Sequence, residues 1–261
     1  MHAPDLLIIL LLAAGATASA YWKKLTPAAA LTGGLIGWAV YKGDGYRGLI
    51  ELALFFILGT AATAWKKKEK LAIRGNAAHQ STRTTGQVIA NGGVAAIIGI
   101  LIILFPTHNA SLSIALAASL SAATGDTLSS ELGLVYGRHC YNILTWKKET
   151  RGPDGVISLE GLLLGTVGSV FIAVAYALPG VQNNAQNAPH SSLSTAMQNA
   201  LQMPPPTAPL LIILAGLIGN LTDSILGASL ERRKWLSNDQ VNFGCTLIAA
   251  ACTLLFTGFH S

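Results

Sequence analysis

"LSIALAASLSAATGDTLSSELG" (residues 112–133) decides the class of this protein, because an apolar run of membrane-crossing length carries two carboxylates, Asp126 and Glu131, in its second half. The whole chain of 261 residues shares this apolar character: 51% of the residues are hydrophobic, 11% are charged and the mean hydropathy is +0.50. Average soluble domains contain about 25% charged residues. The composition therefore predicts an integral membrane protein.

Several segments are apolar enough to cross a membrane. They are residues 4–22, 27–41, 46–65, 88–105, 112–136, 159–178, 208–230 and 241–259. Each is near the roughly 20 residues that a helix needs to cross a bilayer, except residues 27–41, which are short. The segments are rich in Leu, Ala and Gly and lack the alternation of a barrel strand. We therefore expect an all-α, polytopic membrane helix bundle of about eight transmembrane helices, forming a single domain over residues 1–261.

The basic residues predict the orientation of this bundle. Of the 17 Lys and Arg residues, 15 fall in the odd-numbered loops, namely Lys23, Lys24, Lys66, Lys67, Lys68, Lys70, Arg74, Arg83, Arg138, Lys147, Lys148, Arg151, Arg232, Arg233 and Lys234. Only Lys42 and Arg47 fall in the even-numbered loops. The positive-inside rule places the odd loops in the cytoplasm and both termini outside it. Residues 179–207, which contain no Asp, Glu, Lys or Arg, are then an extracytoplasmic connector.

Other features of the composition exclude several classes of partner and site. Residues 1–20 resemble a cleaved signal peptide in their apolar run, but Lys23 and Lys24 follow that run instead of preceding it, so we expect a retained first span. The net charge of +5 is explained by the cytoplasmic loops, so no nucleic-acid partner is predicted. The three cysteines make no disulfide framework, and the scattered histidines have no zinc-site spacing.

Polar side chains gather at the cytoplasmic ends of five predicted helices. Asp126 and Asp223 lie in the inner halves of two helices, and Asn91, Ser158 and Asn242 lie near the beginnings of three others. An ionisable group inside a membrane costs about 2.5–3.5 kcal/mol on insertion scales and commonly marks a functional site. The alternative is that each carboxylate pairs with a basic neighbour and holds the bundle together. We favour function for the two aspartates, because they lie farthest from the helix ends.

This pattern of residues is typical of a site for Mg²⁺ and phosphate. Proteins hold Mg²⁺ by one or two carboxylates together with substrate phosphates, which matches Asp126 and Asp223 on facing helices. Basic clusters in the flanking loops, which the positive-inside rule alone would also supply, could neutralise phosphates: Lys147, Lys148, Arg151, Arg232, Arg233 and Lys234. The chain contains no Walker motif or kinase Gly-rich loop. The sequence thus predicts a phosphate-bearing lipid as the substrate.

Five pieces of the chain carry a resemblance to a known family. They are "QVIANGG" (87–93), "GDTLSSELG" (125–133), "NILTWKK" with "GPDGVISLEG" (142–161), "GNLTDSILGA" (219–228) and "VNF" (241–243). In this order they resemble the integral-membrane family that includes the plant and cyanobacterial phytyl-phosphate kinases and the animal transmembrane protein nineteen. The resemblance covers the chain from about residue 30 to the end. Gly125 replaces the usual Ala of this family, and Thr84 replaces a usual acidic residue.

The resemblance implies Mg²⁺-dependent transfer of a phosphoryl group from a nucleoside triphosphate, with CTP favoured, to phytyl phosphate or a similar prenyl monophosphate. It implies catalytic and metal-binding roles for Asp126, Asp223 and Glu131. Phosphates and metal ligands would be oriented by Asn91, Thr127, Ser130, Ser158, Asn220, Ser224 and Asn242, and the triphosphate would meet Lys147, Lys148 and Arg151. The enzyme would work in contact with membrane lipids at the cytoplasmic side of a bacterial cytoplasmic membrane or its equivalent. Its oligomeric state stays open.

Two other functions are compatible with the same residues. In an ion-coupled transporter the aspartates would bind the coupled ion, but the polar groups lie at one leaflet and not at the midplane, which counts against transport. A polyprenol kinase or a CTP-dependent lipid cytidylyltransferase would use a similar Mg²⁺ site and break a different bond. Release of pyrophosphate would identify the cytidylyltransferase.

Overall fold

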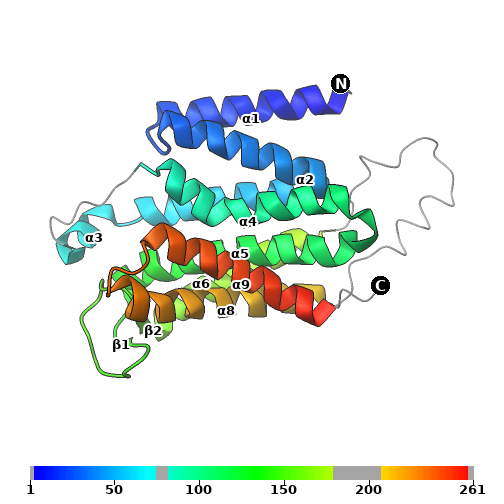
Figure 1. Ribbon diagram of the computed structural model, residues 1–261. Helices are drawn as coiled ribbons and strands as arrows, with labels where there is room; N and C mark the ends of the chain where they lie inside the picture. The colour runs from blue at the N-terminus through cyan, green and yellow to red at the C-terminus, as the bar shows by residue number, and fades with distance from the viewer. Residues whose placement is uncertain (1–2, 75–81, 179–206, 258–261) are drawn as a thin grey trace.

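The computed structural model describes residues 3–74, 82–178 and 207–257 and consists almost entirely of helices (Figure 1). The helices are α1 (Ala3–Tyr21), α2 (Pro27–Ala64), α3 (Lys67–Arg74), α4 (Thr85–Leu104), α5 (Asn109–Tyr136), α6 (Leu159–Ala177), α8 (Ala208–Leu226) and α9 (Asn238–Thr257). A 3₁₀ turn, η1 (Pro106–His108), precedes α5, and a π-helix, η2 (Gly227–Glu231), continues α8. Most of the predicted connector, residues 179–206, lies outside the described residues.

The prediction of a polytopic helical membrane protein is confirmed. Among the described residues, α1, α2, α4, α6, α8 with η2, and α9 are long and apolar enough to cross a membrane. The start of α1 and the end of α9 lie at the same end of the bundle, as an even number of crossings requires (Figure 1). The number of spans and the side on which the termini lie stay predictions.

Helix α5 forms the centre of the bundle and packs against α2, α4, α6, α8 and α9. Its residues from Leu112 to Gly125 are all buried, and most of them are Ala or Ser. Small side chains allow neighbouring helices to approach closely, which supports packing where lipid provides no hydrophobic drive between helices. Helix α5 therefore carries the second half of its sequence, with Asp126, into the interior of the protein.

Helix α2 reverses its direction at Gly45, so its two halves correspond to the predicted spans 27–41 and 46–65. Gly45 has φ 65° and ψ −144°, a backbone conformation that glycine adopts and other residues avoid. Leu25 pairs with Arg83 in an isolated β-bridge, while Gly59 lies against the guanidinium of the same Arg83. A straight helix would separate residues 25 and 59 by about 50 Å at 1.5 Å per residue. The two halves therefore run antiparallel.

Close backbone contact between α2 and α4 leads to a first prediction. A Cβ atom on Gly43 would overlap the carbonyl oxygen and Cα of Gly99. Gly43→Ala is expected to lower the free energy of unfolding by about 1–3 kcal/mol, because backbone atoms cannot move aside as a flexible side chain can. Gly34→Ala is the control on the same helix, since a Cβ there meets nothing within 4 Å. Thermal unfolding in detergent measures both; an equal melting temperature for the two variants would contradict the prediction.

A buried ionic cluster holds the reversal of α2. Arg47 Nε and Nη2 donate to the two carboxylate oxygens of Asp44 at 3.1 and 2.9 Å, and Ser113 Oγ of α5 donates to Asp44 Oδ1 at 2.5 Å. The Arg47 guanidinium lies 4.5 Å from the ring centroid of Tyr176 in α6. The sequence placed Arg47 in a loop, and this is wrong: only 8% of Arg47 is exposed. Neutralisation by Asp44 allows a cation to lie within the bundle.

The opposite end of the bundle carries two further elements. Strands β1 (Cys140–Asn142) and β2 (Val156–Ser158) pair antiparallel, with Cys140 opposite Ser158. The short helix α3 is fastened by Lys70, whose Nζ donates to the carbonyl oxygen of Ala62 at 2.5 Å and to Glu131 Oε2 at 2.5 Å. The side chain of Lys70 is fully buried. The hairpin and α3 thus cover the same end of the bundle, beside the cytoplasmic ends predicted for α5 and α8 (Figure 1).

Candidate active site

A polar cavity of about 490 Å³ lies at this end of the bundle. Helices α4, α6 and α9 begin at the cavity, while α5 and α8 reach it with their C-terminal halves. Helix α4 begins after its cap residue Thr84, and α6 begins after its cap residue Ser158. The positive dipole ends of both helices therefore lie near the cavity. The predicted meeting of five helix ends at one depth is therefore found in the structure.

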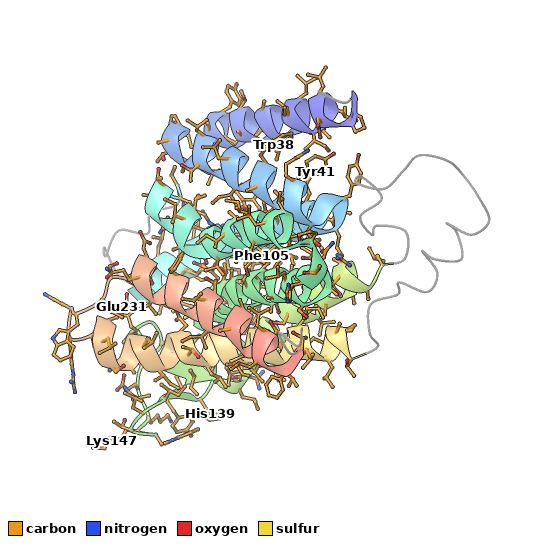
Figure 2. All side chains as sticks on the ribbon, turned by 45° about the vertical axis from the view of Figure 1, so that its right-hand side comes forward. Trp38, Tyr41, Phe105, His139, Lys147 and Glu231 are labelled. Carbon is orange, nitrogen blue, oxygen red and sulfur yellow. The ribbon has the colours of Figure 1, made fainter. Side chains whose placement is uncertain are left out.

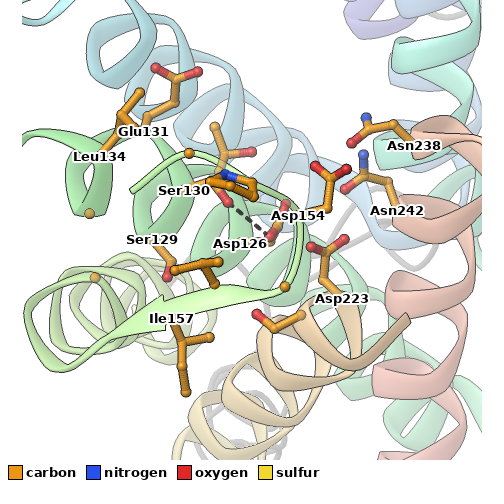
Figure 3. Close-up of a pocket in the computed structure, with 18 of the residues that line it drawn as sticks. Asp126, Ser129, Ser130, Glu131, Leu134, Asp154, Ile157, Asp223, Asn238 and Asn242 are labelled. Carbon is orange, nitrogen blue, oxygen red and sulfur yellow. Dashed lines mark hydrogen bonds between the residues drawn. The ribbon is translucent and has the colours of Figure 1, made fainter. Parts of the chain in front are cut away.

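Acidic side chains occupy one side of the cavity. Asp126 of α5 and Asp223 of α8 lie beside each other in the cavity (Figure 3), and Ser130 Oγ donates to Asp126 Oδ1 at 3.4 Å. Figure 3 shows Asp154, from the loop between β1 and β2, facing the same space as these two aspartates. Glu231 of η2 also lines the cavity. Like charges this close repel one another, so the group is suited to bind a cation.

Glu131 lies apart from this acidic group. Its Oε2 atom is 2.5 Å from Lys70 Nζ, and burial lowers the pKa of the nearby Arg83 guanidinium while the Glu131 carboxylate opposes that shift. Within the described residues, no group of three or more His, Cys, Asp or Glu side chains is close enough to hold a metal ion by itself. The position of Glu131 thus gives no support to its predicted role as a third metal ligand beside Asp126 and Asp223.

The loop from Arg151 to Gly155 places Asp154 in the cavity. Gly152 and Gly155 have φ values of +111° and +73°, which allow the sharp turn. Arg151 Nη1 donates to the carbonyl oxygens of Leu134 and Val135 at 3.3 and 3.0 Å, at the end of α5. On the other side, the loop is held by Arg232. Both ends of the turn are therefore fastened to helices.

Arg232 joins η2 to this loop through two contacts. Its Nε donates to the carbonyl oxygen of Asp154 at 2.7 Å, and its Nη2 donates to Glu149 Oε2 at 2.7 Å. The hydrogen bond from Arg232 lowers the pKa of the Glu149 carboxyl below its usual value. The sequence assigned Arg232 to a cluster that could neutralise phosphates. In this structure its hydrogen bonds hold the loop that carries Asp154 in place.

The cavity is also lined by a cation and several amides. Arg83 lies just before α4, and its guanidinium donates no hydrogen bond to the residues that the structure describes. Gln87 and Asn91 of α4 also line the cavity. Figure 3 shows Asn238 and Asn242 of α9 beside Asp154 and Asp223. A guanidinium carries five N–H donors and can bind an anion through several of them. The cavity thus holds carboxylates that can bind a cation and a guanidinium that can bind an anion.

Most of the side chains predicted for the site line this cavity. They are Asn91, Asp126, Thr127, Ser130, Glu131, Arg151, Ser158, Asp223, Ser224 and Asn242. Lys147 and Lys148 do not line it: both are exposed on the β1–β2 connection, and Lys147 projects from the outer edge of the molecule (Figure 2). Asn220 is buried between helices instead, with its amide near Gly165 of α6. The roles of all these residues stay predictions.

Sequence reasoning missed Arg83 and Asp154. Arg83 was counted only as one of the cytoplasmic basic residues, which the positive-inside rule explains without a site. Asp154 lies in the motif "GPDGVISLEG", where two glycines around a proline and an aspartate indicate a turn, and this turn gave Asp154 no predicted role in the site. The adjoining motifs were a usable signal, because Arg83 precedes "QVIANGG" by a few residues and Asp154 lies inside a matching piece.

Comparison with known protein families matches residues 9–250 of this chain to the family described as integral membrane protein DUF92. The chain belongs to this family. Helices α2 to α8 lie wholly within the match, as does every side chain named above at the cavity. The family thus covers both the bundle and the candidate site.

Individual relatives agree with this assignment. Protein VTE6, chloroplastic, of Arabidopsis thaliana is 32% identical over 215 residues, which cover 80% of this chain and 58% of VTE6. An uncharacterized membrane protein of Methanocaldococcus jannaschii is 29% identical over 85% of this chain and 81% of its own length. An uncharacterized membrane protein of Synechocystis is 28% identical, covering 89% and 82%. No solved structure matches the chain.

Proposed function

We propose that this protein is a Mg²⁺-dependent membrane prenyl-phosphate kinase, which transfers the γ-phosphoryl group of a nucleoside triphosphate, CTP by preference, to phytyl phosphate or a similar prenyl monophosphate. The motifs that resemble the phytyl-phosphate kinase family, together with membership of the DUF92 family, support a function related to prenyl-phosphate kinases. The observation that carries the proposal is that Asp126 and Asp223 lie beside each other in a polar cavity that Arg83 also lines. A volume of about 490 Å³ is in the usual range for small-molecule sites.

The residues of the cavity fit a magnesium ion. Mg²⁺ prefers hard oxygen ligands and is commonly bound by one or two carboxylates with phosphates and waters completing its octahedron. Asp126 and Asp223 would supply the carboxylates, with Asp154 facing the same space. When bound, the ion would neutralise phosphate charge.

Side chains and helix N-termini of the protein would position the phosphates of both substrates. Arg83 would bind a phosphate by charge-assisted hydrogen bonds, and the N-termini of α4 and α6 would attract phosphate oxygens. An oxygen of the prenyl phosphate would attack the γ-phosphorus. The bond from that phosphorus to the β–γ bridging oxygen would break, and the nucleoside diphosphate would leave with that oxygen. A phosphate is already anionic near pH 7, so no strong general base is required.

A turnover assay on detergent-purified protein tests this function. The reaction contains Mg²⁺, γ-labelled CTP or ATP and a panel of prenyl monophosphates. Label in a prenyl diphosphate, with release of CDP or ADP, is the expected result. Release of pyrophosphate with the nucleotide joined to lipid would identify a cytidylyltransferase and overturn the kinase assignment. Active-site location is tested on sealed vesicles of known orientation, where nucleotide supplied to the cytoplasmic face should support turnover.

Replacing Arg83 provides a specific prediction for this mechanism. Arg83→Gln is expected to lower kcat/KM for the prenyl phosphate roughly 10- to 100-fold, the loss expected for a hydrogen bond to a charged group. The backbone pairing of residue 83 with Lys24 and Thr26 does not use the side chain, so the fold should persist. Arg233→Gln is the matched control, because Arg233 is exposed at the same end and does not line the cavity. Equal kinetics for the two variants would contradict the role of Arg83.

A further inference from the structure

A second hollow, of about 240 Å³, lies between α1, both halves of α2 and the beginning of α4. We call it the α1–α2 groove. In contrast to the polar cavity, its walls are almost entirely apolar, and they include Leu12, Leu52 and Phe56. Helix α1 has its main contacts with α2, so the groove separates α1 from the rest of the bundle. The groove therefore offers an apolar ligand a site inside the membrane region of the protein.

The α1–α2 groove and the polar cavity share a wall. Arg83 and Gln87 line both of them. The Arg83 guanidinium lies 5.4 Å from the ring centroid of Phe55, which belongs to the groove. A cation able to bind a phosphate is thus placed where an apolar channel meets a polar one. A molecule with a phosphate head and an apolar tail matches this junction in charge and in polarity.

Two glycines leave space open at the groove. Gly15 of α1 and Gly34 of α2 both line it, and a Cβ atom built on either residue meets nothing within 4 Å. Glycine is unfavourable inside a helix, and here close helix packing does not explain it. At Gly43, by contrast, a Cβ would overlap the backbone of α4. Gly15 and Gly34 therefore leave open space beside the groove that no neighbouring helix fills.

We propose that the α1–α2 groove binds the prenyl chain of the acceptor while Arg83 holds the acceptor's phosphate at the entrance to the polar cavity. This inference rests on the proposed kinase function and assigns the lipid subsite of that reaction. The nucleotide and metal then occupy the acidic side of the cavity, beside Asp126 and Asp223. The groove, and not the catalytic aspartates, selects acceptors by the length of the chain.

Filling the groove tests the proposal. Gly15→Leu and Gly34→Leu each place a branched side chain into the open space. The matched control is Ala14→Leu, because Ala14 is exposed on the same helix and does not line the groove. With phytyl monophosphate, a 20-carbon acceptor, we expect the groove variants to lose at least 10-fold in kcat/KM. With the 10-carbon geranyl monophosphate, which fills less of the groove, we expect a change below 2-fold. Ala14→Leu should match the wild type with both.

Other outcomes would overturn the assignment. Equal losses with both acceptors, or no loss with either, would show that the tail does not lie in the groove. Gly34→Ala, a smaller change in the same space, guards against a folding defect: it should give an intermediate loss for phytyl monophosphate with an unchanged melting temperature. A folding defect would instead reduce the activity on both acceptors alike.

A binding measurement separates this inference from the proposed kinase function. Equilibrium binding of tritiated phytyl monophosphate, without nucleotide, should be weakened at least 10-fold by Gly15→Leu and unaffected by Ala14→Leu. That result would uphold the groove even if no phosphoryl transfer were found, in which case only the proposed reaction would fail. Displacement of the label by phosphatidylglycerol as effectively as by unlabelled phytyl monophosphate would identify a general acyl-lipid site and overturn the proposal.

Discussion

Asp126→Asn is expected to reduce phosphoryl transfer by at least about 100-fold while leaving the protein folded and slightly more stable in the absence of Mg²⁺. The loss of activity follows from removing a carboxylate that would hold the metal beside developing phosphate charge, where a single group commonly contributes 10²–10³ in rate. The gain in stability follows from the closeness of Asp126 to Asp223, since an amide beside a carboxylate removes repulsion between like charges.

Two measurements on the same preparation check this result. Turnover with γ-labelled nucleotide should fall, while the melting temperature without metal should stay level or rise. Addition of Mg²⁺ with nucleotide should stabilise the wild type and not Asp126→Asn. Glu69→Gln is the control, because Glu69 pairs with Lys66 at the surface of the same end of the bundle. Retained activity in Asp126→Asn, or a lower melting temperature without metal, would contradict the proposed site.

Arg47→Met is expected to produce the largest loss of stability among the variants considered, about 3–5 kcal/mol in the free energy of unfolding. Arg47 is the cation that neutralises Asp44 inside the bundle, and the fully buried Glu51 lies near enough to interact with both. Both carboxylate oxygens of Glu51 lack a hydrogen-bond partner among the residues that the structure describes. Removing the guanidinium leaves two carboxyl groups in a region from which water is excluded.

The surface ion pair at the same end of the bundle is the matched control. Lys42 Nζ lies 3.5 Å from Asp5 Oδ1, and 42% of the Lys42 side chain is exposed, so Lys42→Met should cost no more than about 1 kcal/mol. Denaturation in mixed detergent micelles measures both variants. Equal losses would show that burial of the Asp44–Arg47 pair has no energetic consequence. Activity of the folded fraction of Arg47→Met should be normal, because this cluster lies at the opposite end from the cavity.

The positions of the helices were predictable because hydropathy and helix caps are local properties of the chain. The predicted segment 159–178 matches α6 (Leu159–Ala177), which begins after the Ser158 cap, and 208–230 matches α8 with its π-helical continuation. Asp126 and Asp223 were identified for a similar reason, since a carboxylate inside an apolar segment is costly and visible in one dimension. Arg47 was misassigned because a buried cation and a loop cation look alike until the partner Asp44 is located.

The functions of the basic residues were not predictable. The positive-inside rule explains every Lys and Arg at this end, so it cannot separate Lys147, which is exposed, from Lys70, which is buried. Arg232 contacts Glu149 and Asp154 across about 80 positions of sequence, and nothing local signals that contact. Likewise, no sequence signal distinguished Arg83 from the other basic residues. Only the structure shows that it lines both the polar cavity and the α1–α2 groove.

The amino-acid sequence by itself determined that this is a helical membrane protein with a group of acidic and amide side chains at one end, because the bilayer imposes length, hydropathy and charge rules on each helix separately. Only the tertiary structure decided which side chains lie close together. It brings Asp126 beside Asp223, places Asp154 in the cavity through the β1–β2 loop, and pairs Glu131 with Lys70. These contacts between residues far apart in sequence depend on how the helices pack and on where the chain reverses, as at Gly45. Packing is a property of the whole bundle and not of any single helix.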